Sequence, residues 1–167
     1  MDVRTFLAAA EARGWLTRVS TPVSPHLEAA RLIYALGEET VLLERVAGWG
    51  SGVVAGLCAR RRNLALALGV TEQALLSTLV GALRAPREPE RVAQAPCQEC
   101  VVEDVNLEAL PVLTHFPEDG GPYVTSAVLR TRDPERGPNM AFHRLMRVGP
   151  RAFTVRLVEG RGTHQAW

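Results

Sequence analysis

The sequence contains no lysine: all 19 of its basic residues are arginine, against 18 acidic residues, so the formal net charge is +1. Without lysine the chain cannot form a Schiff base through an ε-amino group, and it cannot build a phosphate loop that depends on a lysine. The small net charge provides no overall electrostatic attraction to nucleic acid or to a membrane. No nucleic-acid partner is therefore expected.

Long hydrophobic runs are also missing, because no segment approaches the roughly 18 apolar residues that a membrane span needs. The first 14 residues, MDVRTFLAAAEARG, favour an amphipathic helix over a signal peptide, since Glu11 and Arg13 interrupt the apolar stretch. The sequence therefore predicts no membrane span and a cytoplasmic location. A hydrophobic content of 47% is enough for the core of one domain, or of one domain and part of another.

Cysteine is scarce, and its three residues give an odd number. Cys58 falls in an expected strand, whereas Cys97 and Cys100 form the sequence C-Q-E-C. Such a pair could be a redox motif or half of a zinc site. No second pair follows at zinc-ligand spacing, and the segment after Pro96 reads as extended instead of helical, which favours neither function.

The first half of the chain alternates between helical and strand patterns. Gly14, Gly37 and Gly69 are expected to end helices, while Ser24 with Pro25, and Thr71, are expected to begin them. The expected helices are 5–13, 24–36, 60–68 and 71–83, and the expected strands are 15–20, 40–46 and 53–58. This half is therefore predicted to be α/β, with its two central strands forming a hairpin.

The composition changes at RAPREPER, residues 84–91, where two prolines and alternating charges exclude a packed element. Beyond it, strands are expected at 101–103, 124–131, 140–148 and 152–158, joined by tight turns. Such a series indicates the start of an antiparallel sheet or barrel. We therefore expect an α/β N-terminal domain at 1–84, a linker at 85–96 and a second domain at 97–167. The second domain has too few expected strands for a closed barrel. Either another chain supplies further strands, or the chain ends partway through a fold.

Residues 139–144, NMAFHR, place an amide, an imidazole and a guanidinium close together. Residues five apart in an ideal strand face opposite sides, so Asn139 and Arg144 converge only if the strand is bulged or Asn139 lies outside the ladder. A convergent pair could hold a phosphate with a divalent cation beside it. The simpler alternative is an amide that caps the hairpin turn, a surface arginine, and a structural His143.

Three other polar groups have similar alternatives. Glu118 and Asp119 lie in a turn-rich loop that is either solvated or lines a site, and His164 lies near the end of the sequence, where fraying is expected. The basic run at 59–63 reads as a solvated loop, because no aromatic residues alternate with it as in a nucleic-acid surface.

Several motifs, taken in order, resemble the UbiD family of reversible decarboxylases. The resemblance makes Cys97 part of the family's P-C-Q-E stretch and leaves Cys100 incidental. It implies an antiparallel split β-barrel that binds prenylated FMN, begun within 97–167. The motifs are DVRTFLAAAEARGWLTRVSTPVSPHLEAA near the start, PCQE at 96–99, EDVNLEALPVLTHFPEDGGPYVTSAV at 103–128, the T-R-D-P turn, and N-x-x-x-x-R at 139–144.

The resemblance implies a cofactor that supplies the chemistry, prenylated FMN or FMN, and a small aromatic or α,β-unsaturated carboxylic acid as substrate. Carried over by position, Arg144 matches the arginine that contacts the cofactor and belongs to a Glu-Arg-Glu catalytic network. Thr125 matches a cofactor-contacting threonine. Ala141, Phe142 and His143 match the segment whose backbone runs along the flavin.

The resemblance also implies a divalent metal, Mn²⁺ or Mg²⁺, at the cofactor phosphate, with K⁺ nearby. Asn139 matches the family's asparagine ligand. The histidine ligand should fall within VEGRGTH, where Gly160 or Gly162 stands close to the matching position. His164, slightly beyond it, is the available candidate.

In the family, the glutamate metal ligand and both catalytic glutamates lie downstream of the region matched here. The isolated chain is therefore expected to lack a complete active site and to work only with a second polypeptide that supplies the remainder. A homo-oligomer is a further expectation. One alternative is a non-catalytic flavin- or nucleotide-binding or interaction module derived from that fold. Another is a nonfunctional remnant.

Overall fold

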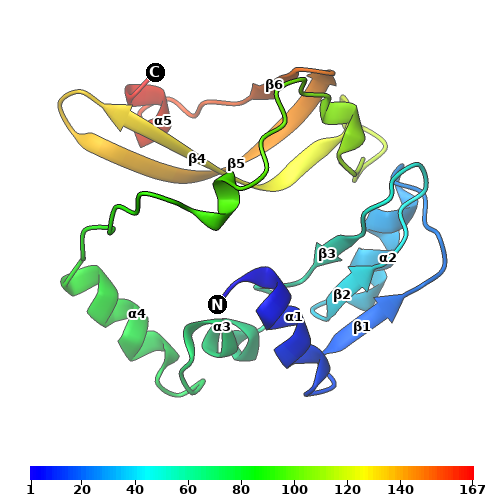
Figure 1. Cartoon of the computed structure of the whole chain (residues 1–167), viewed down its shortest axis with the longest axis horizontal. Helices are drawn as coiled ribbons and strands as arrows, with labels where there is room; N and C mark the ends of the chain where they lie inside the picture. Colours follow the sequence, from blue (N-terminus) through cyan, green and yellow to red (C-terminus); the bar gives the residue numbers. More distant parts are fainter.

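A computed structural model describes residues 1–167 and contains two three-stranded sheets joined by helices and extended segments (Figure 1). In Figure 1 the sheet of β4–β6 lies at the top and the sheet of β1–β3 at the lower right, and α3 and α4 lead from the first sheet to the extended segment that rises to the second. The elements are α1 (Val3–Glu11), β1 (Leu16–Val19), α2 (Glu28–Leu36), β2 (Thr40–Leu43), β3 (Val53–Ala55), α3 (Arg61–Leu68), α4 (Leu75–Arg84), the 3₁₀ turns η1 (Pro96–Gln98) and η2 (Leu107–Ala109), β4 (Tyr123–Asp133), β5 (Gly137–Gly149), β6 (Ala152–Val155) and α5 (Gly162–Gln165).

The first sheet has the order β1-β2-β3, with β1 parallel to β2 and β2 antiparallel to β3. The expected hairpin of two central strands is thus confirmed. Val41 and Leu43 of β2 are fully buried, and Ala29 of α2 packs in the same apolar cluster. The first half of the chain therefore has a closed core between a sheet and its helices, as its α/β pattern predicts.

Helix α2 begins at Glu28, four residues later than predicted, so the expected start at Ser24 and Pro25 is wrong. His26 instead forms an isolated parallel bridge with Thr114, and the Leu27 amide donates to the Thr114 carbonyl. A long-range strand contact therefore overrides the local capping signal. To make this contact, Leu27 adopts a positive φ of 66°, which is unfavourable for a residue other than glycine.

Other elements also differ from the prediction: β2, β3 and β6 each end three residues earlier than expected, so Cys58 lies outside β3. Helix α4 begins at Leu75 instead of Thr71, whose hydroxyl accepts a hydrogen bond from the Ala74 amide in the preceding turn. The strand expected at 101–103 is absent, and Val101 and Val102 are exposed. That apolar pair has no neighbouring strand with which to form a ladder, so its β propensity alone does not produce a strand.

The second sheet has the order β4-β5-β6 and is antiparallel throughout. The register changes between Val124 and Ala127 of β4, where two residues oppose one residue of β5, which defines a β-bulge. At the far end of the hairpin the Asp133 carboxylate accepts hydrogen bonds from the amides of Glu135 and Arg136. The hairpin is thus fixed at its tip and kinked near its base.

The segment 107–114 joins the two sheets. Leu113 is buried in the core of the first sheet, and the Trp49 indole donates to the Glu108 carbonyl. On its other side, the Leu107 amide donates to the Pro150 carbonyl, and the Leu107 carbonyl accepts a hydrogen bond from Arg147. No helix is both long and apolar enough to cross a membrane.

Candidate functional site

The two faces of the β4–β5 hairpin carry different side chains. Asn139 lies in the ladder opposite Thr131, and the bulge lies at the other end of the hairpin, opposite Arg144. Because side chains alternate along a strand, Asn139, Ala141 and His143 share one face, and Arg144 belongs to the other. The structure therefore separates the side chains of Asn139 and Arg144 and does not make them converge.

The face that holds Asn139 carries a cluster of four polar residues. The Asn139 amide nitrogen donates to the hydroxyls of Thr131 and Thr163, at 3.3 Å each. The His143 Nε2 lies 3.0 Å from the same Thr163 hydroxyl. Thr163 belongs to α5 and is only 5% exposed. We call Thr131, Asn139, His143 and Thr163 the threonine–asparagine cluster, and its hydrogen bonds fix the orientation of the Asn139 amide.

These hydrogen bonds also constrain His143. The Thr163 hydroxyl accepts from the Asn139 amide, and it can either donate its own hydrogen to the His143 Nε2 or accept one from it. Thr163 therefore fixes the position of the imidazole ring relative to the Asn139 amide.

The Asn139 carbonyl oxygen is the cluster's free acceptor, because it takes part in no hydrogen bond within the chain. It lies against Gly162, where an added Cβ would come within 2.5 Å of it. Glycine at 162 thus leaves the space beside this oxygen open, and a carbonyl oxygen is a ligand that suits Mn²⁺ or Mg²⁺. Asn139 can therefore supply one oxygen ligand to a metal ion at this place.

The other ligands are not assembled in this chain. Nowhere in it do three histidine, cysteine, aspartate or glutamate side chains gather closely enough to hold a metal ion. Gly162 is the residue that packs on Asn139, whereas His164 is exposed and its side chain forms no hydrogen bond. Cys97 and Cys100 are also exposed and unpaired.

The opposite face centres on Arg144. Its guanidinium lies over the ring of Tyr123, with the carbon atom Cζ 5.3 Å from the ring centroid, a cation–π geometry. Thr125, within the bulge, and Phe142 are exposed, and Phe142 retains 83% of its accessible surface. This face therefore presents a cation held on an aromatic ring beside an uncovered apolar side chain, which suits a planar anionic ligand.

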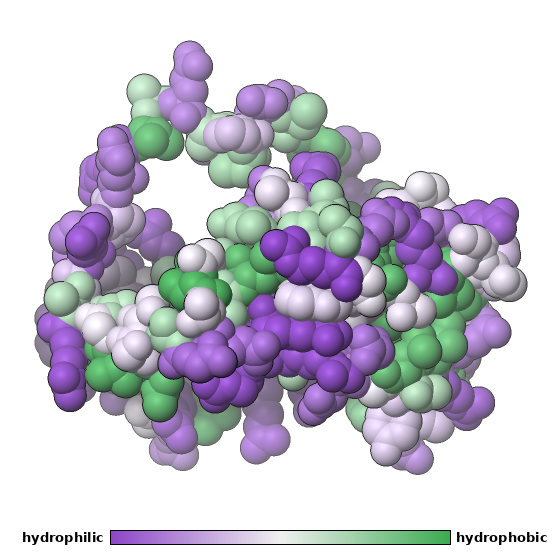
Figure 2. Space-filling view, turned by 90° about the horizontal axis from the view of Figure 1, so that it is seen from below, coloured by the Kyte–Doolittle hydropathy of each residue, from purple (hydrophilic) through white to green (hydrophobic).

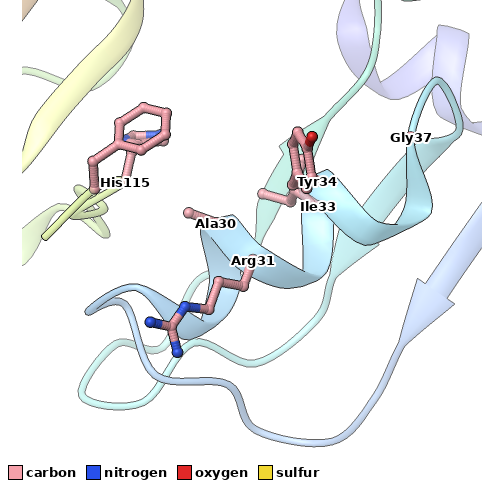
Figure 3. A pocket seen from close by; sticks show the side chains of 7 residues that line it. Ala30, Arg31, Ile33, Tyr34, Gly37 and His115 are labelled. Atoms are coloured by element: carbon pink, nitrogen blue, oxygen red, sulfur yellow. The ribbon is translucent and has the colours of Figure 1, made fainter.

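A separate hollow of about 580 Å³ lies between α2 and the turn at His115 and Phe116 (Figure 3). Figure 3 shows His115 facing α2 across this hollow, with Ala30 and Ile33 on the helix. Tyr34 is 89% exposed, and the buried His115 Nδ1 has no hydrogen-bond partner.

The backbone amides of His115 and Phe116 donate to the Asp119 carboxylate. This carboxylate therefore stabilises its own turn and does not line the threonine–asparagine cluster.

Sequence reasoning missed Thr163, Thr131 and Tyr123. A threonine after a glycine carries no distinctive signal, and the contact of Thr163 with Asn139 spans 24 residues. The contact of Thr131 could have been predicted from the sequence, because a hairpin with its turn at residues 134–136 pairs Thr131 with Asn139. The stacking of Tyr123 on Arg144 occurs beside the bulge, which no residue pattern revealed.

Two family models match the chain. The 3-octaprenyl-4-hydroxybenzoate carboxy-lyase N-terminal domain matches residues 7–83, and the Rift-related domain of the same enzyme class matches residues 90–167. Together they cover nearly the whole chain. The domain boundaries expected at 84 and 97 stay predictions.

The chain is also similar in sequence and structure to individual decarboxylases. The anhydromevalonate phosphate decarboxylase of Methanosarcina mazei is 34% identical over 98% of this chain. The UbiD-class enzyme HmfF from Pelotomaculum thermopropionicum, solved with prFMN in an evolved dimeric form, is 36% identical over 97% of this chain, with a TM-score of 0.88. The closed form of vanillic acid decarboxylase from Sedimentibacter hydroxybenzoicus has a TM-score of 0.87 at 26% identity over 99% of this chain.

The chain spans only 38% or 39% of the length of these relatives. Within that span it has their fold, an α/β N-terminal unit followed by an antiparallel sheet, as the sequence predicts. The chain belongs to the UbiD family of decarboxylases.

Proposed function

We propose that this chain is the N-terminal, flavin-holding part of a UbiD-type non-oxidative decarboxylase that acts on an aromatic or α,β-unsaturated carboxylic acid. The observation that carries the proposal is the 36% identity, over 97% of this chain, to a UbiD-class enzyme solved in complex with prFMN. The same enzyme has also been solved with FMN. The cofactor proposed for this chain is therefore prenylated FMN, or FMN in its place.

When bound, prenylated FMN would supply the electron sink for loss of CO₂. Asn139 is proposed to offer its free carbonyl oxygen to a Mn²⁺ or Mg²⁺ ion at the cofactor phosphate, with K⁺ nearby. Thr131 and Thr163 hold the amide in that orientation through its nitrogen. His164 is the proposed second metal ligand, and it must turn from its exposed position to reach the ion.

Arg144 is proposed as the catalytic residue, because its guanidinium can pair with a substrate carboxylate in the bidentate geometry of an arginine–carboxylate contact. Tyr123 holds the guanidinium on the open face of the sheet. The Thr125 hydroxyl and the backbone of Ala141, Phe142 and His143 are proposed to contact the flavin. With Asn139 on the other face, the cofactor would have to contact both sides of β5.

A second polypeptide is proposed to complete the site. Replacing CO₂ by a proton needs a general acid within reach, and arginine is too basic to supply that proton. The face of the β4–β5 hairpin that carries Arg144 has no carboxylate among its strand residues. The exposed Phe142 and the apolar hollow beside α2 support a covering protein surface, supplied by another polypeptide or by a second copy.

The proposal is tested by native mass spectrometry of the full chain, co-produced with a prenyl-flavin synthase in manganese-containing medium. We expect one prenylated FMN and one divalent ion per chain, both lost in Asn139→Ala and retained in the control Asn106→Ala. A folded chain that carries no flavin under these conditions would contradict the cofactor assignment.

The alternative function is a binding or interaction module that kept the fold without catalysis. Its support is that Arg144 has no carboxylate partner in this chain. Flavin-loaded chain mixed with the C-terminal region of the Methanosarcina relative separates the two functions. CO₂ release from an unsaturated acid, abolished by Arg144→Gln, supports the enzyme, and stable flavin binding without CO₂ release in any mixture supports the module.

A further inference from the structure

A second concave region lies at the far end of the β4–β5 hairpin, where the linker 88–91 passes beside it. The hollow has a volume of about 820 Å³, within the usual range for small-molecule pockets. It is built from three segments that are distant in sequence: the linker, β4 and the start of β5. Its lining residues are Glu88, Pro89, Glu90, Arg91, Arg130, Arg132, Pro138 and Met140.

Three arginines line this hollow. Arg130 and Arg132 are two positions apart on β4, so they share a face and their Cα atoms are about 7 Å apart. Arg91 approaches from the linker. None of the three lies within 4 Å of a carboxylate, although Glu88 and Glu90 line the same hollow. Their hydrogen-bond donors are therefore available to a ligand.

The chemistry of the lining selects a class of ligand. Planar guanidinium groups bind phosphate oxygens in pairs, and a cluster of them is a common phosphate site. Met140, Pro138 and Pro89 add apolar surface that can contact the carbon skeleton of an organic ligand. Glu88 and Glu90 reduce the net positive charge, so they should weaken the binding of any anion.

We propose that the hollow formed by Arg91, Arg130 and Arg132 binds the phosphoryl group of a small organic phosphate. The site lies on the same face of the hairpin as Arg144 but nearer the tip, because Arg130 pairs with Met140 and Arg132 with Pro138. It goes beyond the proposed function, since none of these arginines is assigned to the flavin, the metal or the decarboxylated acid. The tip of the hairpin is held by the Asp133 carboxylate, which accepts hydrogen bonds from the Glu135 and Arg136 amides. Arg130 and Arg132 therefore project from a fixed strand, and only Arg91 lies on the linker.

The test is a calorimetric titration of the full chain with inorganic pyrophosphate, in buffer with a metal chelator and about 0.15 M salt. We expect saturable binding that weakens by more than about tenfold in Arg130→Gln/Arg132→Gln. The matched control Arg156→Gln replaces an exposed arginine that has no ion pair and lies outside the hollow. It should change the affinity by less than about twofold, because a distant exposed charge is screened.

A second variant tests the same site in the opposite direction. Glu88→Gln/Glu90→Gln removes two negative charges from the lining and should tighten pyrophosphate binding several-fold, with the thermal melting of the chain unchanged. The absence of saturable binding by the wild-type chain would overturn the proposal. Equal weakening in Arg130→Gln/Arg132→Gln and Arg156→Gln would also overturn it, since the binding would then reflect overall charge.

Discussion

The two sheets of this molecule differ in how completely their faces are covered. Of the 15 buried residues, only Asp133 and Thr163 lie beyond Leu113, and neither is apolar. The first sheet packs β2 against α2 and buries Val41 and Leu43 completely. The second sheet has residues of its longest strand, such as Phe142, open to solvent. The first sheet can thus be stabilised by its own core, and the second lacks one.

This difference explains where the candidate functional groups lie. The space-filling view in Figure 2 shows apolar patches between hydrophilic residues on the face seen from below. On the second sheet, α5 covers the threonine–asparagine cluster, and the face of Arg144 carries no helix. A sheet with one uncovered apolar face is suited to contact a cofactor or further polypeptide. The following predictions test this division between the two sheets.

The largest effect is expected in the core of the first sheet. Leu43→Ala should lower the free energy of unfolding by about 2–5 kcal/mol, because it leaves a cavity at a fully buried position. Phe142→Ala, in the second sheet, should change it by less than about 0.5 kcal/mol, because that side chain is exposed. Urea denaturation of both variants checks the contrast, and an equal loss would mean that the second sheet also has a core.

A glycine substitution directly after β3 should lower the free energy of unfolding almost as much. Gly56 has a φ of 73°, and an added Cβ would overlap the carbonyl oxygen of Glu39. Gly56→Ala should destabilise the chain by about 2–4 kcal/mol, from the strained conformation and the overlap together. The control Gly50→Ala meets no atom within 4 Å and should be close to neutral. Thermal melting of the two variants makes the comparison, and similar melting temperatures would contradict it.

A smaller effect is expected at the threonine–asparagine cluster. Thr163→Val keeps the shape of the side chain and removes the hydroxyl that contacts both Asn139 and His143, at a cost of about 1–3 kcal/mol. Thr125→Val makes the same change at an exposed position and should be near neutral. The ¹H–¹⁵N signals of the His143 ring should shift in Thr163→Val and stay unchanged in Thr125→Val, because only Thr163 contacts the ring. An unchanged ring spectrum would show that Thr163 does not orient the imidazole.

The smallest effect is a pH dependence at the tip of the second hairpin. The backbone amides of Arg136 and Glu135 donate to Asp133 and lower its pKa below the ordinary value of 3.8. A lowered pKa stabilises the folded state above about pH 4, and this contribution is lost as the pH falls through the folded-state pKa. The stability difference between wild type and Asp133→Asn should therefore shrink from pH 6 to pH 2.5.

As a control, the stability difference between wild type and Asp133→Asn is also measured at high ionic strength. Hydrogen bonds from adjacent amides act at short range, so 1 M NaCl should leave most of the stability difference at pH 6 in place. Urea denaturation across the pH series measures it. A difference that is constant with pH would mean that the charge of Asp133 does not stabilise the hairpin.

The sequence predicted the elements of the fold better than their boundaries. Strands 40–46 and 53–58 were found because a hairpin is a local structure, and so were β4 and β5. The start of α2 was missed because His26 pairs with Thr114, almost 90 residues away, and no local pattern records that bridge. Val101 and Val102 have the composition of a strand but lack a partner strand, so composition alone misled.

The candidate site was predictable only in part, for a related reason. Strand alternation predicted that Asn139 and Arg144 face opposite sides unless the strand is bulged or Asn139 lies outside the ladder, and the structure has Asn139 in the ladder and the extra residue of the bulge in β4. The orientation of their side chains depends on Thr163 and Tyr123, which come from α5 and from the start of β4. These contacts depend on the tertiary fold and on the bulge in β4, and neither leaves a motif in the sequence.

Hydrogen–deuterium exchange of the full chain, read by mass spectrometry over peptides from each sheet, tests the central claim most directly. The claim is that the first sheet is closed by its own core and that the second has no apolar core of its own. We predict that amides of β2 exchange at the rate of global unfolding, while those of β4 and β6 exchange orders of magnitude faster. Equal protection of the two sheets in the isolated chain would contradict the account.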